Sequence, residues 1–246
     1  MCRESSVGCE CQSGVSSPFL AQGELVSTTS PFRALQPQLD EITANIPDAI
    51  ASRIEAGVTE IESSGVAPGL AVGDHAPNFT LPDALGQPVT LADLLAQGPV
   101  VVVFYRGEWC PYCNIQVRSL QEALPGFREL GASLVAISPQ AADHSLSLTE
   151  KHELAFPVLS DLDQEVISAY RVQFTLAGDL EDLQVNVFQN DPRNQNADHS
   201  RSLPVPATFV IDRDGIVRAA FVSSDWRVRA EPADVEAALR SQQAGD

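Results

Sequence analysis

The chain has 246 residues, 44% of them hydrophobic, and its 33 acidic side chains outnumber 15 basic ones, giving a formal net charge of −18. This length allows one sizeable core with an appendage. The acidic surplus argues against nucleic acid and anionic membranes as partners, because both require a basic face. We find no secretory signal and no apolar run near the roughly 20 residues of a membrane span. Five cysteines, an odd number, do not indicate a disulfide framework, and we expect a cytoplasmic location.

Residues 1–32 are rich in Ser, Gly and Gln, and we expect a disordered tail there. This tail holds Cys2, Cys9 and Cys11, which as an alternative could bind a metal or relay thiols. A metal site is disfavoured because these three soft ligands lack a structured fourth.

Residues 33–68 form the predicted N-terminal helical extension. Pro47 divides two stretches in which apolar residues recur at intervals of three and four, which predicts two amphipathic helices. Gly65 and Pro68 end the second helix. We expect this extension to lie against the main domain or against a second subunit. The apolar positions are Leu35, Leu39, Ile42 and Ile46, then Ile50, Ile54, Val58 and Ile61.

Residues 69–246 are predicted to form one α/β domain. Strands and helices alternate first, and the chain then closes with a hairpin around Asp214-Gly215 and a helix. This order implies a mixed central sheet with helices on both faces. The predicted strands are 79–81, 89–91, 99–105, 132–138, 156–159, 206–212 and 216–222. The predicted helices are 92–96, 111–130, 141–152, 164–170 and 232–240, and 189–202 is predicted to be a long polar loop.

The motif Cys110-Pro111-Tyr112-Cys113 follows the buried strand 99–105 directly and opens the next helix. Unpaired amide groups and the positive end of the helix dipole stabilise a thiolate there. Thiols in such motifs have pKa values of roughly 3.5 to 7.5, against about 8.5 for free cysteine. The spacing of three puts both sulfurs on one helical face, within reach of a disulfide. Redox chemistry is therefore predicted, provided that the two sulfurs lie together with an opening to solvent.

Two neighbouring residues are candidate supports for this pair. Arg106 could lower a thiol pKa, or it could form a surface ion pair with Glu108 or another carboxylate. Trp109 is expected to shield the pair from water or to pack in the core. A zinc site would need a second ligand pair, and neither the other cysteines nor the four histidines are suitably spaced, so we expect no metal and no cofactor.

Three stretches resemble the peroxiredoxin-like branch of the thioredoxin superfamily, the alkyl hydroperoxide reductase and thiol-specific antioxidant group. They are Gly73–Leu81, Val103–Cys113 and Pro206–Gly215. The resemblance implies a thioredoxin-like fold, a cysteine sulfenic acid intermediate, and reduction of hydroperoxides with electrons from a thioredoxin- or glutaredoxin-like reductant. A homodimer is a further partner that we consider.

Within a thioredoxin-like sheet, the start of strand 206–212 faces the cysteine pair. Pro206 and Thr208 are therefore candidate supporting residues. We expect a cis Pro206 that presents the backbone of Val205 to a substrate; an ordinary trans strand entry is the alternative.

The motif also departs from the resemblance. Peroxiredoxins carry Pro-x-x-x-Thr-x-x-Cys at this place, whereas here Arg106 takes the proline position and Cys110 the threonine position. Cys113 falls on the position of the peroxide-reactive cysteine. The arginine that usually lies beside that cysteine would fall near Pro206, where the sequence has none.

Three functions remain open at this point. In a thiol peroxidase, Cys113 attacks the peroxide and Cys110 resolves the sulfenic acid into a disulfide. In a thiol–disulfide oxidoreductase, which a Cys-Pro-Tyr-Cys pair of the glutaredoxin type suggests, Cys110 attacks a protein or glutathione disulfide. A non-enzymatic alternative is an iron–sulfur cluster held across a dimer, or a redox-sensing interaction module.

Overall fold

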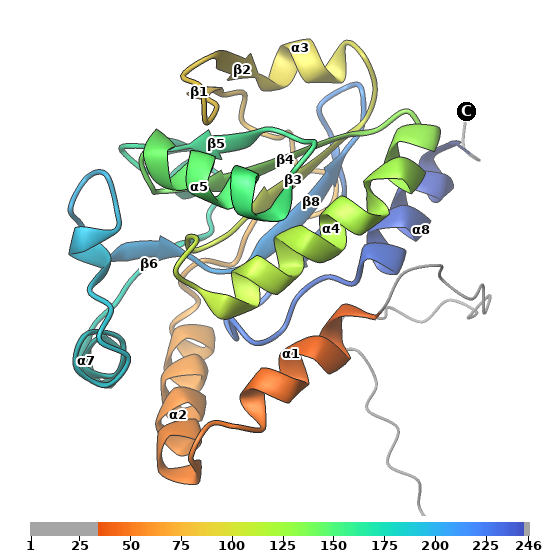
Figure 1. The fold of residues 1–246 in the computed structure, drawn as a ribbon. Helices are drawn as coiled ribbons and strands as arrows, with labels where there is room; N and C mark the ends of the chain where they lie inside the picture. Colours follow the sequence, from red (N-terminus) through yellow and green to blue (C-terminus); the bar gives the residue numbers. More distant parts are fainter. Residues whose placement is uncertain (1–33, 244–246) are drawn as a thin grey trace, which may run out of the picture.

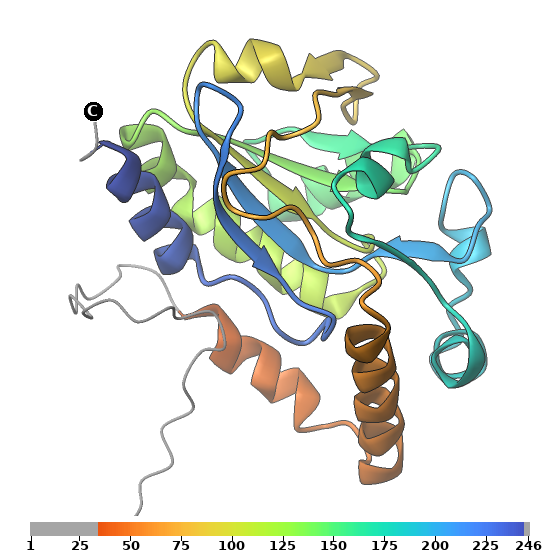
Figure 2. The same cartoon turned by 180° about the vertical axis from the view of Figure 1, so that it is seen from behind.

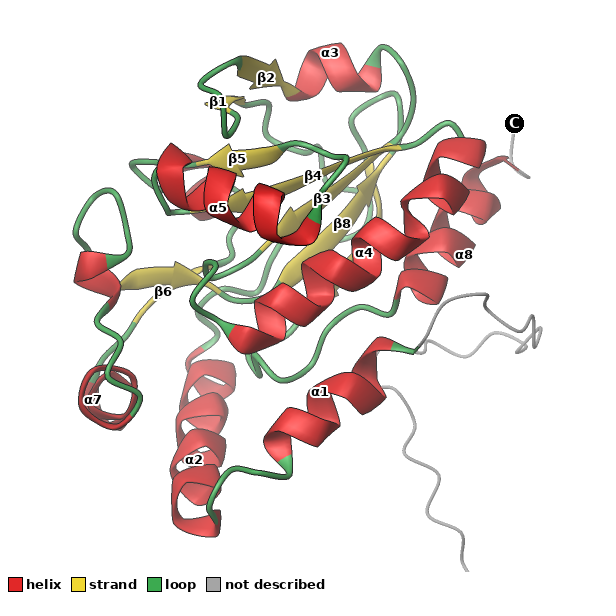
Figure 3. Cartoon of the chain, in the orientation of Figure 1, coloured by secondary structure: helices red, strands yellow, loops and turns green. Residues whose placement is uncertain are grey.

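The computed structural model describes residues 34–243. Figures 1 and 3 show a central sheet with helices packed around it and two helices, α1 and α2, beside it. The helices are α1 (Leu35–Thr43), α2 (Asp48–Ser64), α3 (Leu91–Leu95), α4 (Pro111–Glu129), α5 (Ala142–His152), α6 (Glu165–Ala169), α7 (Gly178–Asp182) and α8 (Pro232–Gln243). The strands are β1 (Thr80–Pro82), β2 (Pro88–Thr90), β3 (Val100–Phe104), β4 (Ser133–Ser138), β5 (Val158–Ser160), β6 (Gln173–Thr175), β7 (Ser202–Pro204), β8 (Ala207–Ile211) and β9 (Val217–Val222).

The five-stranded sheet has the order β5-β4-β3-β8-β9. Strand β3 pairs parallel with β4 and antiparallel with β8, so the sheet is mixed as expected. All five residues of β3 are fully buried. This explains its unbroken run of Val and Phe, since a strand covered on both faces has no polar side to alternate with. The expected α/β thioredoxin-like fold is confirmed.

Helices α4, α5 and α8 pack on one face of the sheet (Figure 1). The opposite face carries α6 and the segment of residues 65–79 (Figure 2). An aromatic cluster lies behind the sheet, where the ring of Tyr170 is 5.0 Å from Phe104 and 5.6 Å from Phe209. The Tyr170 hydroxyl donates a hydrogen bond to the carbonyl of Pro77 at 3.0 Å, which ties the segment 65–79 to this core.

The N-terminal helices lie against the rest of the chain. Helix α1 packs on α4, and α2 packs on α7, where Arg53 forms ion pairs with Asp179 and Asp182. Pro47 begins α2 as its N-cap residue, and Gly65 ends it in the left-handed conformation with φ of +67°. Packing against the main domain is thus one expected alternative that the structure shows; a second subunit stays a prediction. The expected tail, residues 1–32 with its three cysteines, lies outside the described residues.

The region between α6 and β8 holds elements that the sequence pattern did not predict. Strands β6 and β7 form a separate two-stranded sheet, and α7 continues into a π-helical segment, Leu183–Val187. Their length alone does not explain this miss, because β1, β2 and β5 are equally short and were expected. None of the helices within residues 34–243 is long and apolar enough to cross a membrane.

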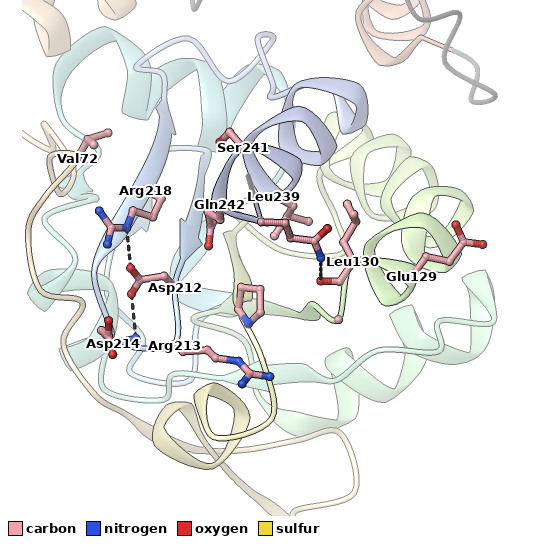
Figure 4. A pocket seen from close by; sticks show the side chains of 13 residues that line it. Val72, Glu129, Leu130, Asp212, Arg213, Asp214, Arg218, Leu239, Ser241 and Gln242 are labelled. Atoms are coloured by element: carbon pink, nitrogen blue, oxygen red, sulfur yellow. Dashed lines mark hydrogen bonds and ion pairs between the residues drawn. The ribbon is translucent and has the colours of Figure 1, made fainter. Parts of the chain in front are cut away.

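A crevice of about 850 Å3 lies at the end of the sheet away from the cysteine pair. The register of β3 and β8 shows this, because Val100 faces Ile211 at this end and Phe104 faces Ala207 at the other. Figure 4 shows the crevice lined by charged side chains, with Asp212 and Arg218 paired at 2.6 Å. Its lining therefore belongs to a different part of the surface from the redox motif.

The packing of the aromatic cluster can be tested by the free energy of unfolding. Substituting the fully buried Phe209 by alanine should lower the free energy of unfolding by about 3–5 kcal/mol, because the site loses transfer energy and keeps a cavity. Leu85→Ala, at a side chain that is 73% exposed, is the control and should cost less than about 0.5 kcal/mol. Urea denaturation measures both, and equal midpoints for the two variants would contradict this packing.

Candidate active site

The cysteine motif is positioned by a sharp turn between β3 and α4. Gly107 has a φ of +146°, and a Cβ there would meet the side chains of Trp109 and Gln140 at 2.5 and 2.7 Å, so only glycine fits. The Gln140 side-chain oxygen accepts a hydrogen bond from the Glu108 amide at 2.6 Å and holds the turn. Cys110 is the N-cap residue of α4, and Pro111 occupies its first turn, as expected.

Cys113 lies in the first turn of α4, and three groups face its sulfur. An Arg229 guanidinium nitrogen lies 3.4 Å from Sγ, the backbone amide of Arg106 donates to it, and the Cys110 thiol hydrogen-bonds to it. Burial is the largest single influence and raises the pKa of Cys113, but the hydrogen bond from Cys110 and the charges of Arg229 and Arg106 together lower it to about 5. Cys113 is therefore a thiolate at neutral pH.

Cys110 has the opposite protonation state. Burial, followed by its hydrogen bond to Cys113, raises the pKa of the Cys110 thiol well above its ordinary value. A thiol that donates to a neighbouring thiolate keeps its proton, since losing it would put two anions side by side. The pair thus consists of one anionic and one protonated sulfur, and both are free cysteines.

Arg106 is buried, with 4% of its surface exposed, and it is not a surface ion pair. Its guanidinium carbon lies 4.8 Å from the ring centroid of Trp109 and 4.9 Å from that of Trp226, which places it between two indoles. One of its nitrogens donates to the Gln184 side-chain oxygen at 2.8 Å. The alternative partner, Glu108, instead accepts a hydrogen bond from ring Nδ1 of His144 at 2.7 Å.

The site holds two buried cations with no carboxylate among their partners. In the described part of the chain, neither Arg106 nor Arg229 forms an ion pair with Asp or Glu, and the Nε atom of each is buried without a hydrogen-bond partner. Burying a guanidinium is costly unless an anion compensates it. The anion that lies within reach of both is the Cys113 thiolate.

Pro206 and Thr208 lie beside this site, as expected. Both line a narrow recess together with Arg229 and Gln116, whose buried side-chain oxygen has no hydrogen-bond partner. The peptide bond before Pro206 is trans, so the expected cis proline is wrong. The proline still fits because it precedes β8, outside the strand's hydrogen-bond ladder with β3.

The sulfurs are closed to solvent in this state. Cys110 and Cys113 are each only 1% exposed, and the recess has no room for a water molecule. Of the two conditions set for redox chemistry, the sulfurs do lie together, but the expected opening to solvent is absent in this state. Chemistry at Cys113 requires that a part of its cover moves.

Three residues of the site carried no signal in the sequence. Arg229 supplies the arginine that the motif lacked near Pro206, but it stands 116 residues from Cys113 and no local pattern marks it. Trp226 reaches Arg106 from the loop of residues 223–231, and Gln184 reaches it from the π-helical segment Leu183–Val187. Within residues 34–243 no three His, Cys, Asp or Glu side chains are grouped to hold a metal ion.

Comparison with known proteins adds independent information. The AhpC/TSA family model matches residues 72–220. A putative peroxiredoxin, MT2597 of Mycobacterium tuberculosis, is 40% identical over 101 residues, which cover 41% of this chain and 64% of that protein. The match thus spans less than two thirds of that relative. The thiol-disulfide oxidoreductase ResA of Bacillus thuringiensis is 24% identical over 163 residues, which cover 66% of this chain and 76% of the ResA chain.

Among solved structures, the peroxidoxin BcpB of Mycobacterium tuberculosis superposes with a TM-score of 0.55 and 27% identity, over 70% of this chain and 97% of its own. The family model covers more than half of the chain and includes both cysteines, β3, α4 and β8. The chain therefore belongs to the AhpC/TSA family.

Proposed function

We propose that the protein is a thiol-dependent peroxidase that reduces hydrogen peroxide or organic hydroperoxides through Cys113 and Cys110. The observation that carries this proposal is the contact between the Arg229 guanidinium and the Cys113 sulfur. Family membership and the similarity to a putative peroxiredoxin support it.

The reaction begins at the thiolate, because the anion is the nucleophilic form of cysteine. The Cys113 sulfur attacks the terminal oxygen of ROOH, the O–O bond breaks, and an S–O bond forms. The leaving alkoxide takes up a proton and departs as an alcohol, or as water when the substrate is hydrogen peroxide. Cys113 is thereby oxidised to sulfenic acid. Arg229 and Arg106 stabilise the negative charge that moves from sulfur to oxygen.

The second step uses Cys110, which lies three residues before Cys113 in the same turn and already contacts it. Its sulfur attacks the sulfenic sulfur, a disulfide forms, and the hydroxyl leaves as water. Because the two residues share the first turn of α4, this disulfide requires little backbone movement. An external dithiol of thioredoxin or glutaredoxin type then reduces the disulfide to two thiols.

Reduction of protein or glutathione disulfides is the second candidate function. The similarity to ResA and the CxxC spacing favour it. The two candidates differ in substrate: the peroxidase reacts faster with hydrogen peroxide than with oxidised glutathione, and the reductase shows the reverse. Stopped-flow oxidation of the reduced protein by each compound separates them.

Serine variants test the assigned order of the two sulfurs. Cys113→Ser should lose rapid oxidation by hydrogen peroxide, because the thiolate is gone. Cys110→Ser should still be oxidised but should stop at sulfenic acid, which dimedone traps and mass spectrometry detects. Trp109 and Trp226, which flank Arg106, provide the fluorescence signal. Rapid peroxide oxidation of Cys113→Ser would contradict the proposal.

The pH profile tests the electrostatics of the site. The rate of the wild-type protein with hydrogen peroxide should be half-maximal near pH 5 and fall about tenfold per pH unit below it, because protonation removes the nucleophile. Arg229→Met should move this midpoint upward by about one to three units, because an opposite charge stabilises the thiolate. Arg218→Met, at the far end of the sheet, is the matched control and should leave the midpoint unchanged. An unshifted Arg229→Met profile would refute the role of that arginine.

A further inference from the structure

We propose that Glu231 is a positioning residue: its carboxylate fastens helix α1 to the loop of residues 223–231, and this holds Arg229 against the Cys113 sulfur. The inference concerns the proposed active site, but the contacts on which it rests do not depend on the reaction. Both partners, α1 and the whole of this loop, lie outside the 72–220 region that the family model matches.

Glu231 anchors the beginnings of two helices. Its two carboxylate oxygens accept hydrogen bonds from the backbone amides of Leu35 and Gln36 at 2.7 Å each, at the start of α1. Its backbone carbonyl accepts from the amides of Asp234 and Val235, in the first turn of α8. The carboxylate therefore satisfies amide groups that α1 itself cannot pair, and its charge suits the positive end of that helix.

A second bond ties α1 to the same loop. The Gln36 side-chain amide donates to the carbonyl of Arg227 at 3.3 Å, one residue after Trp226 and two before Arg229. Trp226 stacks on Arg106, and Arg229 contacts Cys113. The loop held by α1 thus supplies Arg229 itself and one of the two indole rings that pack on Arg106.

The other end of α1 reaches the cysteine motif itself. The Thr43 hydroxyl lies 3.1 Å from the hydroxyl of Tyr112, the residue between Pro111 and Cys113. Figure 1 shows α1 running beside the start of α4, with the loop that precedes α8 between α4 and the beginning of α1. Leu35 and Leu39 are fully buried and add apolar contact to these polar ones. Helix α1 therefore bridges the motif and the loop that carries its counter-ion.

This arrangement explains why the sulfurs are closed and what can open them. The charged and titratable groups facing Cys113 are Cys110, Arg106 and Arg229, with the buried Tyr105 hydroxyl nearby. Of the two guanidiniums, that of Arg229 comes from a loop secured through Glu231 to a neighbouring helix. Releasing α1 frees this loop, so Arg229 leaves the sulfur and the cover loosens.

The test is the pH dependence of Cys113 alkylation by iodoacetamide in the full-length protein, with the modified cysteine assigned by fragment-ion mass spectrometry. In Glu231→Gln the side chain can accept a hydrogen bond at its one oxygen only. Its NH2 group then faces the other of the two backbone amides, those of Leu35 and Gln36, and cannot accept from it. We expect its alkylation midpoint to rise by about one pH unit, because Arg229 is held less firmly. Its limiting rate at high pH should also rise, because the sulfur is less covered.

The matched control is Glu236→Gln, which removes an acidic group of α8 that pairs with Arg240 and makes no hydrogen bond to α1. It should keep the wild-type midpoint. Gln36→Ala, on the opposite side of the contact, should shift the midpoint in the same direction, and it serves if Glu231→Gln fails to fold. Midpoints equal to wild type in the folded variants would overturn the proposal. Alkylation needs no peroxide, so a wild-type protein that fails to reduce peroxide would refute the proposed function without affecting this result.

Discussion

The proposed active site depends on one electrostatic contact, that of the buried Arg229 guanidinium with the Cys113 sulfur, 3.4 Å apart. Neither charged form is favoured alone in an apolar surrounding, because a buried guanidinium lacks a compensating anion and a buried thiol keeps its proton. Together they make burial tolerable and keep the sulfur reactive. Arg106 adds a second cation, which two indole rings hold in place. The surroundings of the cysteine are thus positively charged, although the chain as a whole has a formal net charge of −18.

This contact also separates the roles of two sulfurs that the motif presents as equivalent. Cys110 and Cys113 share a helical turn, and sequence alone left open which of them attacks. The structure distinguishes them by surroundings: Cys113 accepts hydrogen bonds from the Arg106 amide and the Cys110 thiol and contacts Arg229, whereas Cys110 donates its S–H to Cys113 and keeps its proton. A peroxidase with this arrangement carries its resolving thiol within hydrogen-bond distance, so the proposed disulfide forms inside one turn of α4.

The sequence predicted the parts of the molecule that repeat or break a local pattern. The valine run of β3, the Pro111 helix start and the hairpin at Asp214-Gly215 each have a local cause and were found. Arg229, Trp226 and Gln184 were missed, because segments far along the chain bring them in and tertiary packing alone decides their place. The expectations of a cis Pro206 and of an opening to solvent at the sulfurs were wrong for the same reason, since both features depend on how neighbouring segments pack.

The central claim is that Cys113, and not Cys110, is the anionic sulfur of the resting protein. Carbon-13 NMR of protein labelled at the cysteine Cβ follows each thiol separately as the pH changes. We expect the Cys113 signal to titrate near pH 5 while Cys110 stays protonated through neutral pH. A Cys110 signal that titrates below that of Cys113 would contradict it.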